Sequence, residues 1–165
     1  MEHEEWKCIY SMYYKPLLLY ALSLTKNQQD VEDLIQETFI KAFLSYEKSG
    51  SLKFWLVTVL KHEFFNLCRR KQREVLSEDH EKIENQQREK QEDFLEQIIR
   101  DEERRILFQE IQNLPVREKE ILMEGIYFHF TDEEIAAMHH LSTVNVRKIR
   151  SRAKKKLIER LEGTL

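Results

Sequence analysis

Residues Phe130–Leu157 are FTDEEIAAMHHLSTVNVRKIRSRAKKKL, a pattern typical of two helices joined by a tight turn. Thr131 is placed to cap the first helix, and Glu134, three residues later, completes a capping-box sequence. Ser142 is placed to cap the second helix. The turn is predicted at residues 139–141, where His140 stands at a position that often requires a positive φ. Histidine tolerates that conformation better than most residues.

The second of these helices is strongly basic. Between Arg147 and Arg160 there are eight Lys or Arg residues and one acid, although the whole chain carries a formal charge of −3. Helical spacing turns Val146, Ile149 and Ala153 inward. The residues predicted to face outward are Asn145, Arg147, Lys148, Arg150, Ser151, Arg152 and Lys154. Such a helix fits the major groove of DNA, where Arg and Asn read base edges and Lys neutralises phosphate. From this segment alone, a solvated helix on a small bundle is the alternative interpretation.

The composition predicts an all-α fold of one or two small domains. The chain has 165 residues, 41% of them hydrophobic, and only three Gly and two Pro interrupt its helical periodicity. Cys8 and Cys68 are isolated and lack the spacing of metal ligands, which predicts reduced thiols. The N-terminus lacks the order of a signal peptide, and no apolar run is long enough to span a membrane. We therefore expect a cytoplasmic protein without membrane insertion.

Three helices are predicted in the N-terminal part. The first covers Trp6–Leu24, with a kink or a break at Pro16. Asn27 is placed to cap the second, which extends to Leu44. Its apolar face is formed by residues at intervals of three and four: Val31, Leu34, Ile35, Thr38, Phe39, Ala42 and Phe43. A polar loop, Tyr46–Ser51, precedes a third helix over Leu52–Arg73 with a basic end.

Residues 74–92 differ in composition from their surroundings. They are rich in Glu, Gln and Lys and contain almost no large apolar residues, which predicts a flexible acidic linker. Helical periodicity resumes at Phe94. The predicted organisation is therefore two small helical domains, residues 1–73 and 93–165, joined by this linker.

Three segments in this order resemble bacterial sigma factors of the sigma-70 family. DVEDLIQETFIKAF (30–43) resembles the segment that binds core RNA polymerase, and SLKFWLVTVLKHEFFNLCRRKQR (51–73) resembles the helix that melts and reads the −10 element. LPVREKEIL (114–122) and the helix-turn-helix resemble the −35-reading domain. A chain with only these two domains, sigma region 2 and sigma region 4, is similar to the extracytoplasmic-function (ECF) group.

The resemblance implies a transcription initiation factor and a role for particular residues. Core polymerase would bind Asp33, Gln36 and Glu37. The melted −10 element would contact Tyr46, Lys48, Ser49, Ser51, Lys53, Lys61, His62, Arg69 and Arg70, with Trp55 expected in the core. The duplex −35 element would contact Ser142, Thr143, Asn145, Arg147, Lys148, Ser151, Arg152 and Lys154. The implied partners are core RNA polymerase, promoter DNA and an anti-sigma factor.

Other functions remain to be weighed against this one. No phosphate-binding glycine loop, nucleophile motif or zinc-ligand spacing occurs in the sequence, so we expect neither an enzyme nor a cofactor or metal site. A simple helix-turn-helix regulator is the alternative DNA-binding function. A third possibility is a sigma-like decoy that binds polymerase without using promoters. The acidic segment joined to a basic, aromatic third helix favours a sigma factor, because a plain regulator needs neither.

Overall fold

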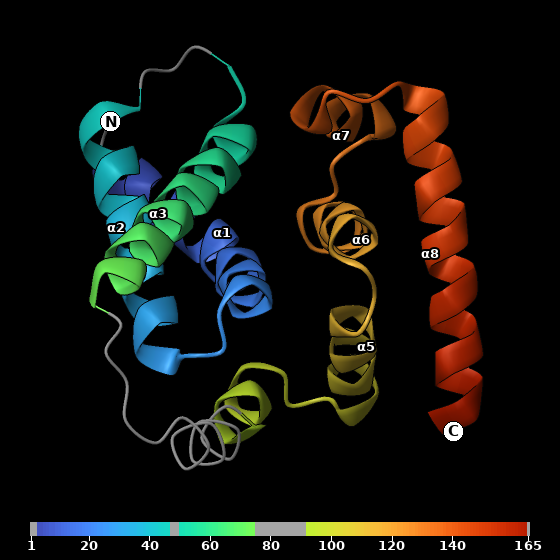
Figure 1. Cartoon of the computed structure of the whole chain (residues 1–165). Helices are drawn as coiled ribbons and strands as arrows, with labels where there is room; N and C mark the ends of the chain where they lie inside the picture. Colours follow the sequence, from blue (N-terminus) through green and yellow to red (C-terminus); the bar gives the residue numbers. More distant parts are fainter. Residues whose placement is uncertain (1–2, 47–49, 75–91, 165) are drawn as a thin grey trace. The chain divides into compact units, whose positions relative to one another are not determined.

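The computed structural model describes residues 3–46, 50–74 and 92–164, and the regular structure in these ranges is α-helical, as predicted (Figure 1). The chain divides into two compact units, Met1–Ile98 and Ile99–Leu165. The predicted linker, 74–92, falls almost wholly on residues 75–91, which lie outside the described ranges. Its description as a flexible acidic linker therefore stays a prediction.

The first unit is built on three helices, α1 (His3–Leu24), α2 (Gln28–Ser45) and α3 (Leu52–Glu74). Each of the three packs against the other two. A kink or a break was predicted at Pro16; helix α1 continues through this residue, so the break is wrong. The six residues that follow, Leu17–Leu22, are all buried, and this apolar packing offsets the backbone hydrogen bond that proline removes.

Helix α2 begins and packs largely as its sequence predicts. The side chain of Asn27 accepts a hydrogen bond from the backbone N–H of Asp30 at 3.1 Å. The apolar face is buried except for Phe43, which is 52% exposed and packs its ring against Trp6, with centroids 5.3 Å apart. The opposite face presents the polar residues Asp33, Gln36 and Glu37 to solvent.

The second unit contains α5 (Glu102–Gln112), α6 (Val116–Phe128), α7 (Asp132–His139) and α8 (Thr143–Thr164). A short helix over residues 92–98 precedes it in the chain. Helix α8 packs against all three other helices of the unit. Its 22 residues give a length of about 33 Å, enough for one part to complete the core while another presents a surface.

Candidate functional surfaces

The helix-turn-helix of the second unit has the caps that its sequence predicts. The Thr131 hydroxyl accepts the N–H of Glu134 at 3.2 Å, and the Glu134 carboxylate accepts the N–H of Thr131 at 3.0 Å. The Ser142 hydroxyl accepts the N–H of Asn145 at 3.1 Å. His140 ends α7 in the left-handed conformation, with φ of 54°, as expected at this turn. The two helices are therefore held at a fixed turn by side chains and backbone alike.

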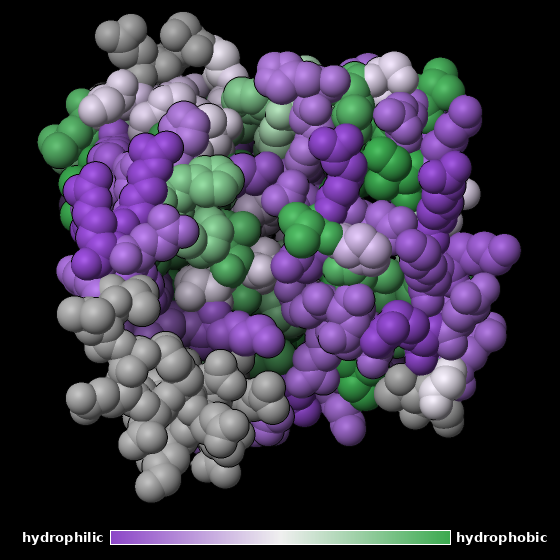
Figure 2. Space-filling model, viewed as in Figure 1, coloured by the Kyte–Doolittle hydropathy of each residue, from purple (hydrophilic) through white to green (hydrophobic). Residues whose placement is uncertain are grey.

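Helix α8 separates an inward face from a basic outward face. Val146 and Ala153 are fully buried and Ile149 is half-buried, as their spacing predicts. Seven of the eight residues predicted to contact a −35 element are exposed, and Thr143 at the helix start is half-buried. Hydrophilic side chains cover most of the α8 surface seen in Figure 2. Arg150, predicted to face outward, is instead half-buried.

A buried acid–histidine contact fixes α7 against α6. Nε2 of His139 lies 2.7 Å from Oε2 of Glu124, whose side chain is fully buried, and the His139 side chain is 9% exposed. The carboxylate of Glu120 lies 3.9 Å from Nδ1 of the same ring. Because a buried carboxylate without a partner is costly, this pairing favours one position of α7 on α6.

Two ion pairs fasten the rest of α8 to the unit. Lys156 Nζ lies 2.9 Å from a carboxylate oxygen of Glu118 on α6, and Arg160 Nε lies 2.8 Å from Glu110 on α5. These contacts lie one to three turns beyond Ser151 and Arg152, towards the C-terminal end. The ion pairs of Lys156 and Arg160 therefore fix the C-terminal half of α8, while most of the predicted −35 contacts lie in its N-terminal half.

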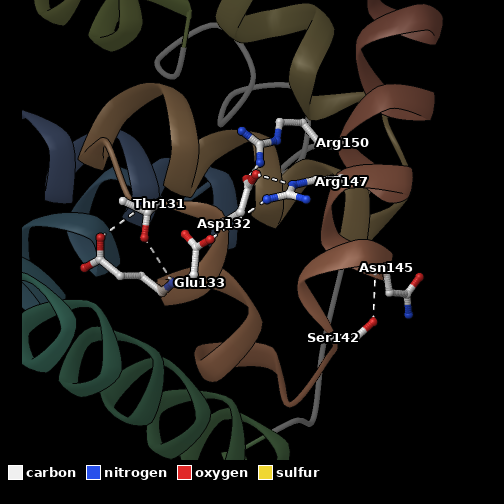
Figure 3. A network of polar contacts seen from close by, with 8 residues as sticks. Thr131, Asp132, Glu133, Ser142, Asn145, Arg147 and Arg150 are labelled. Carbon is white, nitrogen blue, oxygen red and sulfur yellow. Dashed lines mark hydrogen bonds and ion pairs between the residues drawn. The ribbon is translucent and has the colours of Figure 1, made fainter.

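A network at the start of α7 engages two arginines of α8 (Figure 3). The carboxylate of Asp132 accepts a hydrogen bond from Nε of Arg147 at 3.2 Å and forms an ion pair with Arg150. Oε1 of Glu133 lies 4.0 Å from Nη2 of Arg147. Arg147 is one of the predicted −35 contacts. The contact with Asp132, an acid of the preceding helix, orients the Arg147 guanidinium.

The first unit has a groove between α2 and α3 with a volume of about 560 Å³. It is lined by all three residues predicted to bind polymerase, Asp33, Gln36 and Glu37, together with apolar and polar neighbours: Asp30, Leu34, Ile40, Glu63, Asn66, Leu67 and Arg70. Ile40 is 51% exposed, so the groove combines an apolar strip with acidic side chains. This combination suits an amphipathic helix that carries basic residues.

Ion pairs between α2 and α3 hold the two walls of this groove together. Lys41 pairs with the largely buried Glu63, and Lys71 pairs with Asp30. The hydrogen bond that Lys41 donates to Glu63 raises the pKa of Lys41 above its usual value, because it favours the charged ammonium. Arg70, predicted as a −10 contact, lines the groove beside the acidic residues.

The predicted −10 residues lie along α3 and the loop before it. The Tyr46 hydroxyl donates a hydrogen bond to the carbonyl of Gly50 at 2.8 Å, and its ring packs edge-on against Trp55, with centroids 5.7 Å apart. Trp55 is half-buried rather than a core residue. The Ser51 hydroxyl caps α3 by accepting the N–H of Phe54 at 3.2 Å. Lys48 and Ser49 lie outside the described residues.

Other members of this set are spread along α3. His62 and Arg69 are exposed, whereas Lys53 and Lys61 are half-buried. Nζ of Lys61 lies over the Tyr20 ring, 5.7 Å from its centroid. Trp55 and His62 are seven residues apart, which places them on one side of α3 about 10 Å from each other. Arg69 lies two further turns along.

Comparison with known proteins identifies the family to which this chain belongs. Residues 9–74 match Sigma-70 region 2, and residues 104–157 match Sigma-70, region 4. The chain belongs to the ECF group of sigma-70 factors. It is therefore an RNA polymerase sigma factor, which supports transcription initiation and is not itself an enzyme.

Individual proteins that resemble this chain in sequence or in fold include further sigma factors. The sigma factor is 28% identical to the RNA polymerase sigma factor YlaC of Bacillus subtilis, over 87% of this chain and 86% of YlaC. It is 38% identical to the ECF sigma factor SigM of the same organism, over 43% of this chain and 45% of SigM. The fold matches that of the sigma factor RpoE of Bartonella quintana, solved with the anti-sigma factor NepR, with a TM-score of 0.66 and 21% identity, over 96% of this chain and 98% of RpoE. A second match is CnrH, solved with the cytosolic domain of CnrY, with a TM-score of 0.62 and 16% identity, over 98% of this chain and 90% of CnrH.

Sequence reasoning missed several residues of this sigma factor that line or orient the candidate surfaces. Glu63 and Asn66 in the groove and Asp132 beside Arg147 gave no local signal, because their roles depend on contacts with another helix. No helix in the described ranges is long and apolar enough to cross a membrane. Within the same ranges, no group of three or more His, Cys, Asp or Glu side chains could hold a metal ion.

Proposed function

We propose that this sigma factor divides promoter opening among three surfaces. The groove between α2 and α3, through Asp33, Gln36 and Glu37, docks a helix of core polymerase. The outward face of α8 reads the duplex −35 element. The loop 46–51 and the exposed side of α3 hold the melted −10 element.

The observation that carries the docking proposal is the groove itself. Its acidic residues lie beside Leu34, Ile40 and Leu67, so one amphipathic helix can bury apolar side chains while its Arg and Asn side chains meet carboxylates. The two ion pairs between α2 and α3 keep the groove formed before the partner arrives. A preorganised groove loses less entropy on binding.

The −35 proposal is supported by the anchoring of α8 and the exposure of its N-terminal half. Arg147, Lys148 and Ser151 lie at intervals that place them on one side of the helix, and all three are exposed.

Arg69 and the other basic residues at the end of α3 would contact backbone phosphate, which adds affinity without sequence preference.

Two further assignments complete the proposal. An anti-sigma factor would hold the protein inactive, as suggested by the complex of RpoE with the anti-sigma factor NepR. The protein would act in the cytoplasm, where core polymerase and promoter DNA are found. The acidic residues 74–92 would span the distance between the two promoter elements.

The experiment that tests the function is run-off transcription with purified core polymerase on a library of genomic fragments. We expect initiation from fragments that share two sequence elements about two duplex turns apart. A chain that co-purifies with core polymerase yet starts no transcript on any fragment would be a decoy rather than an initiation factor.

A further inference from the structure

Asp132 occupies the first position of α7 and contacts two arginines that come from α8. The capping box of Thr131 and Glu134 fixes this turn, so the Asp132 carboxylate has little freedom. One of its oxygens accepts the Nε–H of Arg147 at 3.2 Å, and the other pairs with Arg150. Figure 3 shows both guanidinium groups converging on this one carboxylate.

The two arginines differ in exposure. The side chain of Arg150 is 25% exposed, and that of Asp132 is 20% exposed, whereas the side chain of Arg147 is 62% exposed. Arg150 therefore stabilises the packing of α7 on α8 and neutralises part of the negative charge of Asp132. Arg147 reaches past the same acid towards solvent, on the face of α8 that is proposed to read DNA.

The geometry leaves the reading edge of Arg147 available. A guanidinium has five N–H donors, one on Nε and four on the two terminal nitrogens. Asp132 uses Nε, and the Glu133 carboxylate oxygen, 4.0 Å from Nη2, is beyond hydrogen-bond length. The outer edge formed by the two terminal nitrogens is the pair of donors that matches O6 and N7 of guanine.

We propose that Asp132 is a specificity-determining residue that holds Arg147 ready to read a guanine in the −35 element. Without this contact, the long arginine side chain would sample many rotamers and would reach backbone phosphates as readily as bases. With it, the side chain meets the duplex in one orientation, and little rotamer entropy is lost on binding. The proposal rests on the −35 assignment of α8.

The test uses the full chain assembled with core polymerase on a promoter library randomised over the −35 element. The wild-type holoenzyme should prefer guanine at one position by about tenfold, and Arg147→Ala should remove that preference. Asp132→Ala should remove the preference at the same position while total promoter affinity stays equal or rises, because an acid near DNA has been lost. Asp132→Asn keeps an oxygen that can accept the Nε–H and should retain part of the preference.

A matched control is Glu110→Ala. This change removes the ion pair of Glu110 with Arg160 on the same helix, whose atoms lie 2.8 Å apart in the wild type, and removes the same charge far from the reading face. It should leave the guanine preference intact. That result would show that the effect of Asp132→Ala comes from the contact with Arg147 and not from the loss of one negative charge.

Three results would overturn the proposal. If Arg147→Ala removes the preference and both Asp132 variants keep it, Arg147 reads DNA without help from Asp132. If Asp132→Ala tightens binding with the preference unchanged, the contact is inhibitory rather than positioning. If Arg147→Ala has no effect at any −35 base, the assignment of Arg147 fails, and the proposal for Asp132 fails with it.

Discussion

At the residue scale, two histidines adopt a conformation that histidine seldom occupies. His129 ends α6 with φ of 55°, and His140 ends α7 with φ of 54°. Each gives its backbone N–H to a carbonyl of the helix that it ends, Glu124 for His129 and Ala136 for His140. The turn of the helix-turn-helix therefore depends on backbone geometry that most side chains resist.

Glycine at position 140 should stabilise the second unit. His140→Gly removes the steric cost of the left-handed conformation, worth about 1 kcal/mol after the entropy of glycine is subtracted. Urea unfolding followed by circular dichroism would measure the change. Ala137→Gly, at an exposed helical position of α7, is the control and should destabilise by about 1 kcal/mol. Equal destabilisation by both variants would contradict the argument.

Arg147 and Lys148 are adjacent on α8 and should behave differently. Arg147→Ala should cost roughly 1–3 kcal/mol on a promoter with the matched −35 element and little on promoters without it. Lys148→Ala, as a phosphate contact, should weaken binding by a similar factor on all sequences. Holoenzyme binding to matched and scrambled −35 promoters distinguishes them. An equal loss on every sequence would assign Arg147 to phosphate as well.

At the element scale, α7 is positioned by a buried contact. Glu124→Ala removes the partner of the His139 ring at 2.7 Å, and we expect a loss of about 1–3 kcal/mol in the free energy of unfolding. Glu124→Gln retains an oxygen acceptor and should lose less. Gln109→Ala, an exposed position on α5, should stay within about 0.5 kcal/mol. A loss in Glu124→Ala no larger than in this control would show that the contact contributes nothing.

Helix α2 should bind polymerase through one face only. Replacing Asp33 and Glu37 together by Lys reverses the charge of the groove, and the change at exposed positions should alter stability by only about 0.5 kcal/mol each. Co-purification with core polymerase should be lost.

The control for this double variant makes the same charge change elsewhere. Glu159 and Glu162 are exposed acids near the end of α8, and their replacement by Lys should leave polymerase binding intact. Normal binding by a folded Asp33, Glu37 double variant would remove the docking assignment.

At the scale of the whole molecule, each unit should read its own promoter element. Exchanging the loop 46–51 for that of another ECF factor should change the preferred −10 base, because Tyr46 and Ser51 help shape the start of α3. Preference at −35 should not change. A randomised −10 library and permanganate footprinting would measure both. A swapped protein with its original −10 preference would make the loop a connector only.

The sequence alone was sufficient to predict an all-helical fold, the caps at Asn27, Thr131 and Ser142, and the left-handed turn at His140. These features depend on interactions within a few residues, so local chemistry specifies them. The three sigma-like segments in order also predicted the family. The sequence did not predict that α1 continues through Pro16 or that the helical periodicity from Phe94 onward is interrupted at residues 99–101. Trp55 was assigned wrongly to the core, and Phe43, on the predicted apolar face of α2, is 52% exposed, because helical periodicity gives the direction of a side chain and not what covers it.

Only the tertiary structure decided which residues of different helices meet. The groove that combines Asp33 with Glu63 and Arg70 requires α2 and α3 to lie side by side. The contact of Asp132 with Arg147 joins residues fifteen positions apart, on two helices. In the sequence Asp132 is an ordinary acid in the first turn of a helix, where the helix dipole alone accounts for it. Its position beside Arg147, the arginine that we propose reads DNA, follows from the packing of α7 on α8, which no local pattern specifies.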